Sequence, residues 1–256
     1  MADVVSAQNA AFERVHSLLA KVDGSLRIPG GDWTAHQLVA HLVSTARRYS
    51  DPNPDAMAPT PRDVDVLNDR EIDVLMSSSM RDLVSDLAFA HAELQEASSH
   101  RDADDSVPFH AGLTLSPTAA AGEWLGELLV HGRDLARAAG VRWTMSDADS
   151  LIVAAFTFEV LPAYIDTARI RRPLDVVVKL RGGTPQLVTV RGRLVEIRDA
   201  ERASRPHAVI AARPSAWVLL GYGRTSLARA IPRGLLVLGG NRPWRALEFQ
   251  RAAIRP

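Results

Sequence analysis

Glu127 and His131 are the two residues whose types and spacing point most directly to chemistry. They lie four apart in a largely apolar run, ELLVHGRDL at residues 127–135. On a helix, residues four apart lie one turn along and about 40° round the axis, so a carboxylate and an imidazole placed there can hold one ion. An ionisable pair that faces the interior of a bundle is costly unless it is paired or bound to metal. The segment therefore offers two candidate ligands of a metal ion.

His41 is the third candidate ligand. It follows Leu38 by three residues and precedes Leu42, which places its ring on the buried stripe of a helix. Two histidines and one carboxylate make a three-ligand set that leaves coordination positions for water or substrate, as in catalytic rather than structural zinc sites. Spacing alone leaves the alternative open, because a histidine on an apolar face is more often a hydrogen-bonded core residue, and Glu-x-x-x-His occurs by chance on many helices.

Helices must position these residues, and the first 139 residues are typical of a helical bundle. Apolar residues recur at helical spacing between Gly, Pro and capping residues. Thr34 is the expected N-cap of the helix that carries His41. Ser116 and Pro117 open the helix that carries Glu127 and His131, and Gly140 follows its end. The expected helices are residues 4–22, 35–49, 64–75, 81–97 and 117–139.

The second part of the chain changes from helical to alternating periodicity. Residues 147–168 predict one more helix, interrupted at Pro162, and the alternation begins at Leu174. Strands are expected at 174–181, 186–191, 193–198, 207–212 and 235–238, and helices at 215–220, 226–231 and 243–254. We therefore expect an α+β protein with two domains, a helical bundle at 1–145 and a smaller α+β domain at 171–256, joined by a linking helix at 146–170.

Composition restricts the chemistry and the location of the protein. The 256 residues contain no cysteine, which excludes disulfides, thiolate zinc sites and a cysteine nucleophile. Any thiol must therefore arrive with a substrate or cofactor. The chain has no run of about 18 to 20 apolar residues and no secretion signal at its N-terminus, so we expect a cytoplasmic protein that does not enter membranes.

The zero net charge hides an asymmetry between the two halves. Residues 1–150 carry 12 basic and 23 acidic side chains, whereas residues 151–256 carry 18 and 7. The difference suggests two domains that attract one another, or a basic domain that meets anions. Mutual attraction favours a monomer. Nucleic-acid binding is disfavoured because the basic half lacks a recognition helix and strands with interleaved aromatics.

Two motifs and the tail of the chain resemble a known family. The motifs are DWTAHQLVAHL at residues 32–42 and ELLVHGRDL at residues 127–135. They resemble the mycothiol-dependent maleylpyruvate isomerase family, which belongs to the DinB-like four-helix superfamily. The tail, with GYGRTSL at residues 221–227, is similar to that family's second domain, which resembles sterol carrier proteins. The resemblance spans nearly the whole chain.

The resemblance implies a divalent metal site with His41, Glu127 and His131 as ligands and a water completing it. It also implies mycothiol, the sugar thiol of actinobacteria, as thiol cosubstrate, and zinc as the first choice of metal for a nitrogen and carboxylate set. The implied chemistry is addition of the thiol to a small, electrophilic, anionic substrate. An isomerase would then eliminate the thiol to give the trans product, and an S-transferase would keep the adduct. No separate general base is assigned.

Three further residues are weaker candidates. Asp134, one turn beyond His131, is placed to orient a ligand ring, or is a solvated or salt-bridged helix residue. Arg224 and Arg242 lie in or beside glycine-containing turns of the second half. Either can hold a substrate carboxylate, because arginine binds carboxylates bidentately, although a solvent-exposed arginine is the alternative for each.

Other polar and aromatic residues are expected to be structural or exposed. Glu123 precedes Glu127 by one turn and is expected to be an exposed helix acid, and His36 a surface residue of the first helical turn. Trp33 is expected to pack at the start of its helix. The histidines without a partner at ligand spacing are His16, His91, His100, His110 and His207.

A function without catalysis is the competing hypothesis. In that case the second domain would hold an apolar small molecule or lipid, and the bundle would keep a vestigial or sensory metal site. A bound metal with a free coordination position favours the enzyme, whereas a wide apolar tunnel within residues 170–256 favours the binding protein.

Overall fold

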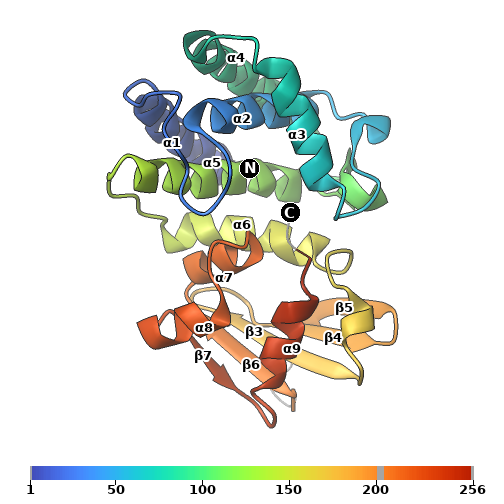
Figure 1. Ribbon diagram of the computed structural model, residues 1–256. Coiled ribbons are helices and arrows are strands. Elements are labelled where there is room, and N and C mark those ends of the chain that lie inside the picture. Colours follow the sequence, from blue (N-terminus) through green and yellow to red (C-terminus); the bar gives the residue numbers. More distant parts are fainter. Residues whose placement is uncertain (1, 201–204, 255–256) are drawn as a thin grey trace. The chain divides into compact units, whose positions relative to one another are not determined.

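The computed structural model describes residues 2–200 and 205–254. The chain divides into two compact units, Met1–Met145 and Ser146–Pro256. The first unit is helical, and the second contains a mixed five-stranded sheet with helices (Figure 1). The α+β organisation in two parts that the sequence predicts is therefore confirmed. None of the helices in the described ranges is long and apolar enough to cross a membrane.

Five long helices build the first unit. Helix α5 packs against α1 and α2, and α2 also packs against α3 and α4. A short hairpin that the sequence did not predict lies between α4 and α5. The elements are α1 (Ala2–Leu19), α2 (Ala35–Ser50), η1 (Pro54–Ala56), α3 (Val64–Leu75), α4 (Met80–Ser99), β1 (Val107–Pro108), η2 (His110–Gly112), β2 (Thr114–Leu115) and α5 (Pro117–Ala138).

Caps fix where α2 and α5 begin and end. The Thr34 side chain accepts from the backbone N–H of Gln37, and the Gln37 side chain accepts from the backbone N–H of Thr34, so both form a capping box. Ser116 caps α5, with Pro117 in its first turn. Gly140 ends α5 in the left-handed region, at φ +67°. These caps set the register of the two helices that carry the candidate ligands.

The second unit is built on one sheet with strand order β5-β4-β3-β6-β7, in which β3 and β6 are parallel and the other pairs antiparallel. Its first helix stops at Val160 rather than continuing to residue 168, because Pro162 cannot extend it. The elements are α6 (Asp147–Val160), η3 (Thr167–Arg169), β3 (Leu174–Leu180), β4 (Gln186–Arg191), β5 (Leu194–Asp199), β6 (Ala208–Ala212), α7 (Pro214–Gly221), α8 (Leu227–Ala230), η4 (Ile231–Arg233), β7 (Leu236–Gly239) and α9 (Arg245–Ala252).

Alternation along the strands gives the sheet one apolar face. Val176 and Val178 point to this face and are fully buried, with Trp217 and Phe249 from the helices in the same core. Helices α7, α8 and α9 lie on that side of the sheet (Figure 1). The hydrophobic core of the second unit is therefore the layer between these helices and the sheet.

A close contact at Gly132 ties the end of the first unit to α5. A Cβ built on Gly132 would lie 2.4 Å from the ring of Trp143 and 2.8 Å from a methyl group of Val15. The Trp143 ring is also covered by the guanidinium of Arg14, at 3.8 Å from the ring centroid. Glycine is therefore required beside His131 because an indole occupies the space of its missing side chain.

We predict that Gly132→Ala lowers the free energy of unfolding by about 1–3 kcal/mol, the usual cost of overpacking. This loss is expected even though alanine is the better helix former by about 1 kcal/mol. Denaturant unfolding of the variant and of Gly31→Ala measures it. A Cβ added at Gly31 would meet no atom within 4 Å, so that control should change stability by less than about 0.5 kcal/mol. Equal stability of Gly132→Ala and the parent would contradict the contact.

Candidate metal centre

His41, Glu127 and His131 meet at the interface of α2 and α5. Glu127 Oε2 lies 2.9 Å from His41 Nε2 and 3.2 Å from His131 Nε2. All three residues are buried, with exposed fractions of 4%, 8% and 5%. The structure thus brings together the three candidate ligands that the sequence predicts, with His41 and Glu127 86 residues apart in the chain.

The geometry of the three donor atoms fits a small divalent ion. The three offered atoms all lie within 4.8 Å of one another, and in the described ranges no other cluster of three such residues meets this limit. Donor atoms placed tetrahedrally at about 2.0–2.1 Å from zinc are about 3.3 Å apart, close to the two distances at Glu127. An ion would replace the hydrogens between the rings and the carboxylate.

The electrostatics of the group also suit a metal. Burial lowers the pKa of His41, and this effect outweighs the hydrogen bond to Glu127, so the ring is neutral as a ligand must be. Burial alone would raise the pKa of Glu127, but the hydrogen bonds from His131 and His41 hold it well below the usual range. The site therefore combines an ionised carboxylate with a neutral imidazole in a buried position.

Trp33 forms one wall of the site. Its ring centroid lies 4.9 Å from that of His41 and 5.9 Å from that of His131, and the two imidazoles are 4.8 Å apart edge to face. The sequence predicted only that Trp33 packs at the helix start. Its position one residue before the N-cap instead brings the indole against both candidate ligands.

Glu123 is buried, with 5% of its surface exposed, so the expectation of an exposed acid is wrong. It lies one turn before Glu127 on the same face of α5. Burial and the neighbouring Glu127 raise the pKa of Glu123 well above its usual range, against the opposing charge of Arg48. The buried polar residues of the site therefore extend along α5 to Glu123, one turn further than the sequence predicts.

Arg48 is the buried cation among these polar residues. Its guanidinium is ion-paired with Glu71 and donates to Asn68 Oδ1 at 3.1 Å, and it lies 3.1 Å from His110 Nε2. Burial lowers the pKa of Arg48, but charge from Tyr49 and the Glu71 ion pair more than offset this and raise it. The side chain of Arg48 thus contacts Asn68 and Glu71 of α3 and His110 of η2.

Asp134 is buried, with 2% of its surface exposed, and one of its oxygens lies 3.6 Å from the Arg133 guanidinium. Its burial removes the solvated alternative that the sequence left open. Its role in orienting a ligand ring stays a prediction.

The two second-unit arginines singled out from the sequence differ in exposure. Arg242 is exposed, and the partly buried Arg224 donates to the carbonyl of Tyr222 at 2.9 Å. Their proposed role toward a substrate carboxylate stays a prediction. The structure buries a third arginine, Arg245, which sequence reasoning missed because its partners are backbone carbonyls far along the chain.

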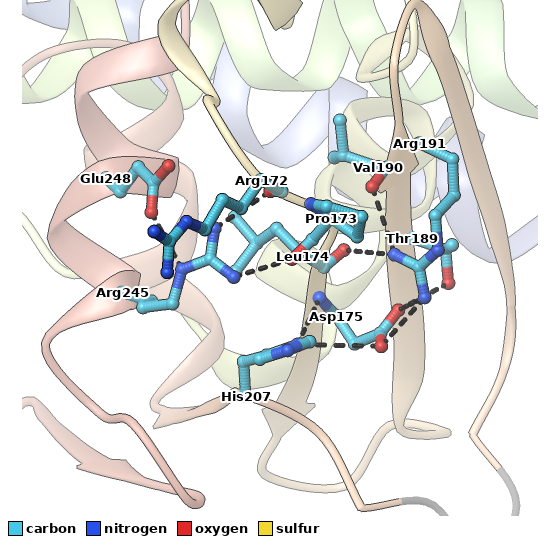
Figure 2. A network of polar contacts seen from close by, with 10 residues as sticks. All are labelled: Arg172, Pro173, Leu174, Asp175, Thr189, Val190, Arg191, His207, Arg245 and Glu248. Carbon is cyan, nitrogen blue, oxygen red and sulfur yellow. Dashed lines mark hydrogen bonds and ion pairs between the residues drawn. The ribbon is translucent and has the colours of Figure 1, made fainter.

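Arg245 joins α9 to the start of β3. It donates to the carbonyls of Pro173, at 2.6 Å, and Arg172, at 2.9 Å, and to Glu248, at 2.8 Å (Figure 2). In the same view Asp175 accepts from Arg191 at 2.8 and 2.9 Å. Each of the three Arg245 guanidinium nitrogens donates one of these hydrogen bonds, so the side chain holds α9 to the start of β3.

His91 and His110 are buried outside the site. His91 Nδ1 accepts from the Trp124 indole N–H at 3.1 Å, its Nε2 lies 2.9 Å from Asn9 Oδ1, and the ring stacks on Phe12. Burial lowers the pKa of His91 to about 4. Burial, and then Arg48, lower the pKa of His110 to about 3. Both are structural residues of the bundle that stay neutral.

The chain belongs to the family of the mycothiol maleylpyruvate isomerase N-terminal domain, whose sequence profile matches residues 5–136, a little over half of the chain. The matched span contains all three residues of the candidate metal centre. No curated protein sequence matches the chain.

Two solved structures share its fold. A crystal structure of the mycothiol-dependent maleylpyruvate isomerase is 14% identical, with a TM-score of 0.53 over 88% of this chain and 90% of that one. A histidine-to-alanine mutant of the mycothiol-dependent maleylpyruvate isomerase is 13% identical, with a TM-score of 0.54 over 94% of both chains. At these identities the likeness establishes the fold alone.

We predict that the protein binds about one zinc ion per chain at this site, the stoichiometry of a single three-ligand centre. His41→Ala and Glu127→Gln should each remove most of the bound zinc, because two protein ligands hold the ion poorly. Plasma mass spectrometry of protein purified without chelator measures the content. The exposed His100→Ala is the matched control and should keep its zinc. Equal zinc in all four proteins would place the ion elsewhere.

We also predict that the first unit loses stability as the pH falls from about 6.5 to 4. The folded pKa of His91 lies below its unfolded value, so acid favours the unfolded state, which binds the proton. At about 1.4 kcal/mol per pH unit, the protonation of His91 alone lowers the free energy of unfolding by about 3 kcal/mol over this range. Urea unfolding at a series of pH values should give a shallower dependence for His91→Gln than for the parent and for His100→Ala. Identical slopes would show that His91 does not carry the effect.

Proposed function

We propose that the protein is a metal-dependent enzyme that uses mycothiol to attack a small electrophilic, anionic substrate. It acts either as a cis–trans isomerase of the maleylpyruvate type or as a thiol S-transferase, with zinc bound by His41, Glu127 and His131. The observation that carries this proposal is the buried two-histidine, one-carboxylate group in a member of the mycothiol maleylpyruvate isomerase N-terminal domain family.

The three ligands prepare the site for a thiol. A divalent ion held there supplies Lewis acidity, which lowers the pKa of a thiol or polarises a carbonyl group. Glu127 and two neutral imidazoles bring one negative charge, so they leave a positive excess that favours an anionic thiolate. Three protein ligands also leave coordination positions open. Trp33 packs on both imidazoles and keeps water from that side of the site.

The absence of cysteine supports an external thiol. In the isomerase reaction the thiol sulfur and a proton add across a cis carbon–carbon double bond. The resulting single bond rotates, and elimination of the thiol restores the double bond in the trans form. In the transferase reaction the adduct is released instead. Arg224 and Arg242 are the proposed partners of a substrate carboxylate.

The test is turnover by the zinc-loaded protein with mycothiol and either maleylpyruvate or other small α,β-unsaturated acids. NMR spectroscopy distinguishes a trans product from a thiol adduct. We predict turnover with mycothiol that glutathione does not replace. Glu127→Gln should lower the rate by at least about 100-fold, the scale of losing electrostatic stabilisation of a transition state. The exposed Glu93→Gln should leave the rate unchanged.

A zinc-loaded protein that consumes none of these substrates with either thiol would contradict the enzyme proposal. The non-catalytic binding protein would then be the better account of the chain. Turnover that is equal in Glu127→Gln and the parent would show a reaction that does not use this site.

A further inference from the structure

Two buried polar atoms on α2 lack a hydrogen-bond partner within the described part of the chain. They are Nδ1 of His41 and Oγ1 of Thr45, in residues that are 4% and 2% exposed. A buried polar atom without a partner costs free energy, so such atoms are rare in folded proteins. Two of them one helical turn apart, beside a candidate metal centre, point to a shared function.

The orientation of His41 explains why its Nδ1 needs an acceptor. Its Nε2 faces Glu127 and is the atom that binds metal. A neutral imidazole bound through Nε2 carries its hydrogen on Nδ1. Histidine ligands almost always donate this second N–H to an acceptor, which fixes the tautomer and the ring plane. In the metal-bound state an acceptor for His41 Nδ1–H is therefore required.

Thr45 lies one helical turn beyond His41 on α2. Side chains four apart on a helix are neighbours, with about 5–6 Å between their Cβ atoms. The hydroxyl of Ser44 is already used, because it donates to the His41 carbonyl at 3.0 Å. The two unpartnered atoms are not in direct hydrogen-bond contact, and a single internal water is the simplest bridge between two buried polar atoms.

We propose that Thr45 is a positioning residue of the metal centre, whose hydroxyl accepts the Nδ1–H of His41 through one buried water. This inference rests on the proposed metal site and adds a residue to it. Thr45 acts through His41 and touches neither metal nor substrate. It fixes the ring so that Nε2 points at the ion together with Glu127 and His131.

The test compares Thr45→Val, which keeps the shape and removes the hydroxyl, with Thr45→Ser, which keeps the hydroxyl. Competition against a chromophoric chelator measures zinc affinity. Thr45→Val should bind zinc about 10–100-fold more weakly, the usual effect of losing such a partner, and Thr45→Ser should stay within about threefold of the parent. The metal-free Thr45→Val protein should be at least as stable as the parent, because it no longer buries an unpartnered hydroxyl.

Weaker zinc binding without a loss of stability in the metal-free protein would distinguish a positioning role of Thr45 from a packing role. A second readout is nitrogen-15 NMR of the zinc-loaded proteins. In the parent it should show a proton on Nδ1 of His41 that is protected from exchange with solvent. In Thr45→Val this proton should lose its protection. A purely structural role would instead lower the stability of the metal-free protein and leave zinc affinity unchanged. That result would overturn the proposal.

Glu123 provides the competing acceptor, because its Oε2 is also buried without a partner in the described ranges. If Glu123→Gln weakened zinc binding and Thr45→Val did not, the acceptor would be Glu123 and the assignment of Thr45 would be wrong. A parent protein that binds no zinc at all would overturn the metal site itself. Equal zinc binding by the parent and Thr45→Val is therefore the failure of the Thr45 assignment alone, whereas a parent without zinc is the failure of the metal site.

Discussion

The contact of one carboxylate with two imidazoles, between α2 and α5, is the interaction on which the first unit depends. Glu127 is ionised in a buried position, which is tolerated only because both rings are within hydrogen-bond distance of the same oxygen. The contact needs the two helices in one register. That register is set locally, by the capping box at Thr34 and by the cap at Ser116.

The need to compensate buried charge extends beyond these three residues. Glu123 continues the acidic row on α5, and Arg48 supplies a positive charge that Glu71 and His110 hold from other segments. The same two helices also carry fully buried apolar residues, Leu38, Leu42, Leu125 and Leu128. The bundle therefore places these polar residues inside an apolar core, where a charge interacts more strongly than it does in water.

Local signals made most of the fold and the three residues of the candidate metal centre predictable. Capping residues and periodicity located α2 and α5 to within about two residues. The spacing of Glu127 and His131, with His41 on the Leu38 stripe, marked the candidate ligands, and the family resemblance of the two motifs joined them into one proposed set. The burial of Glu123 and Arg245 was not predictable, because it depends on partners supplied by distant segments. Trp33 was placed at a helix start correctly, but its packing on two rings requires the tertiary arrangement of α2 and α5.

Anomalous diffraction at the zinc absorption edge, from crystals grown with zinc, tests the central claim most directly. The account predicts one strong peak inside the first unit, at about 2.0–2.1 Å from His41 Nε2, His131 Nε2 and an oxygen of Glu127. Zinc bound only at surface residues, with both rings still hydrogen-bonded to Glu127, would contradict it. The buried group would then be a structural ion pair, and the thiol chemistry proposed for it would have no centre.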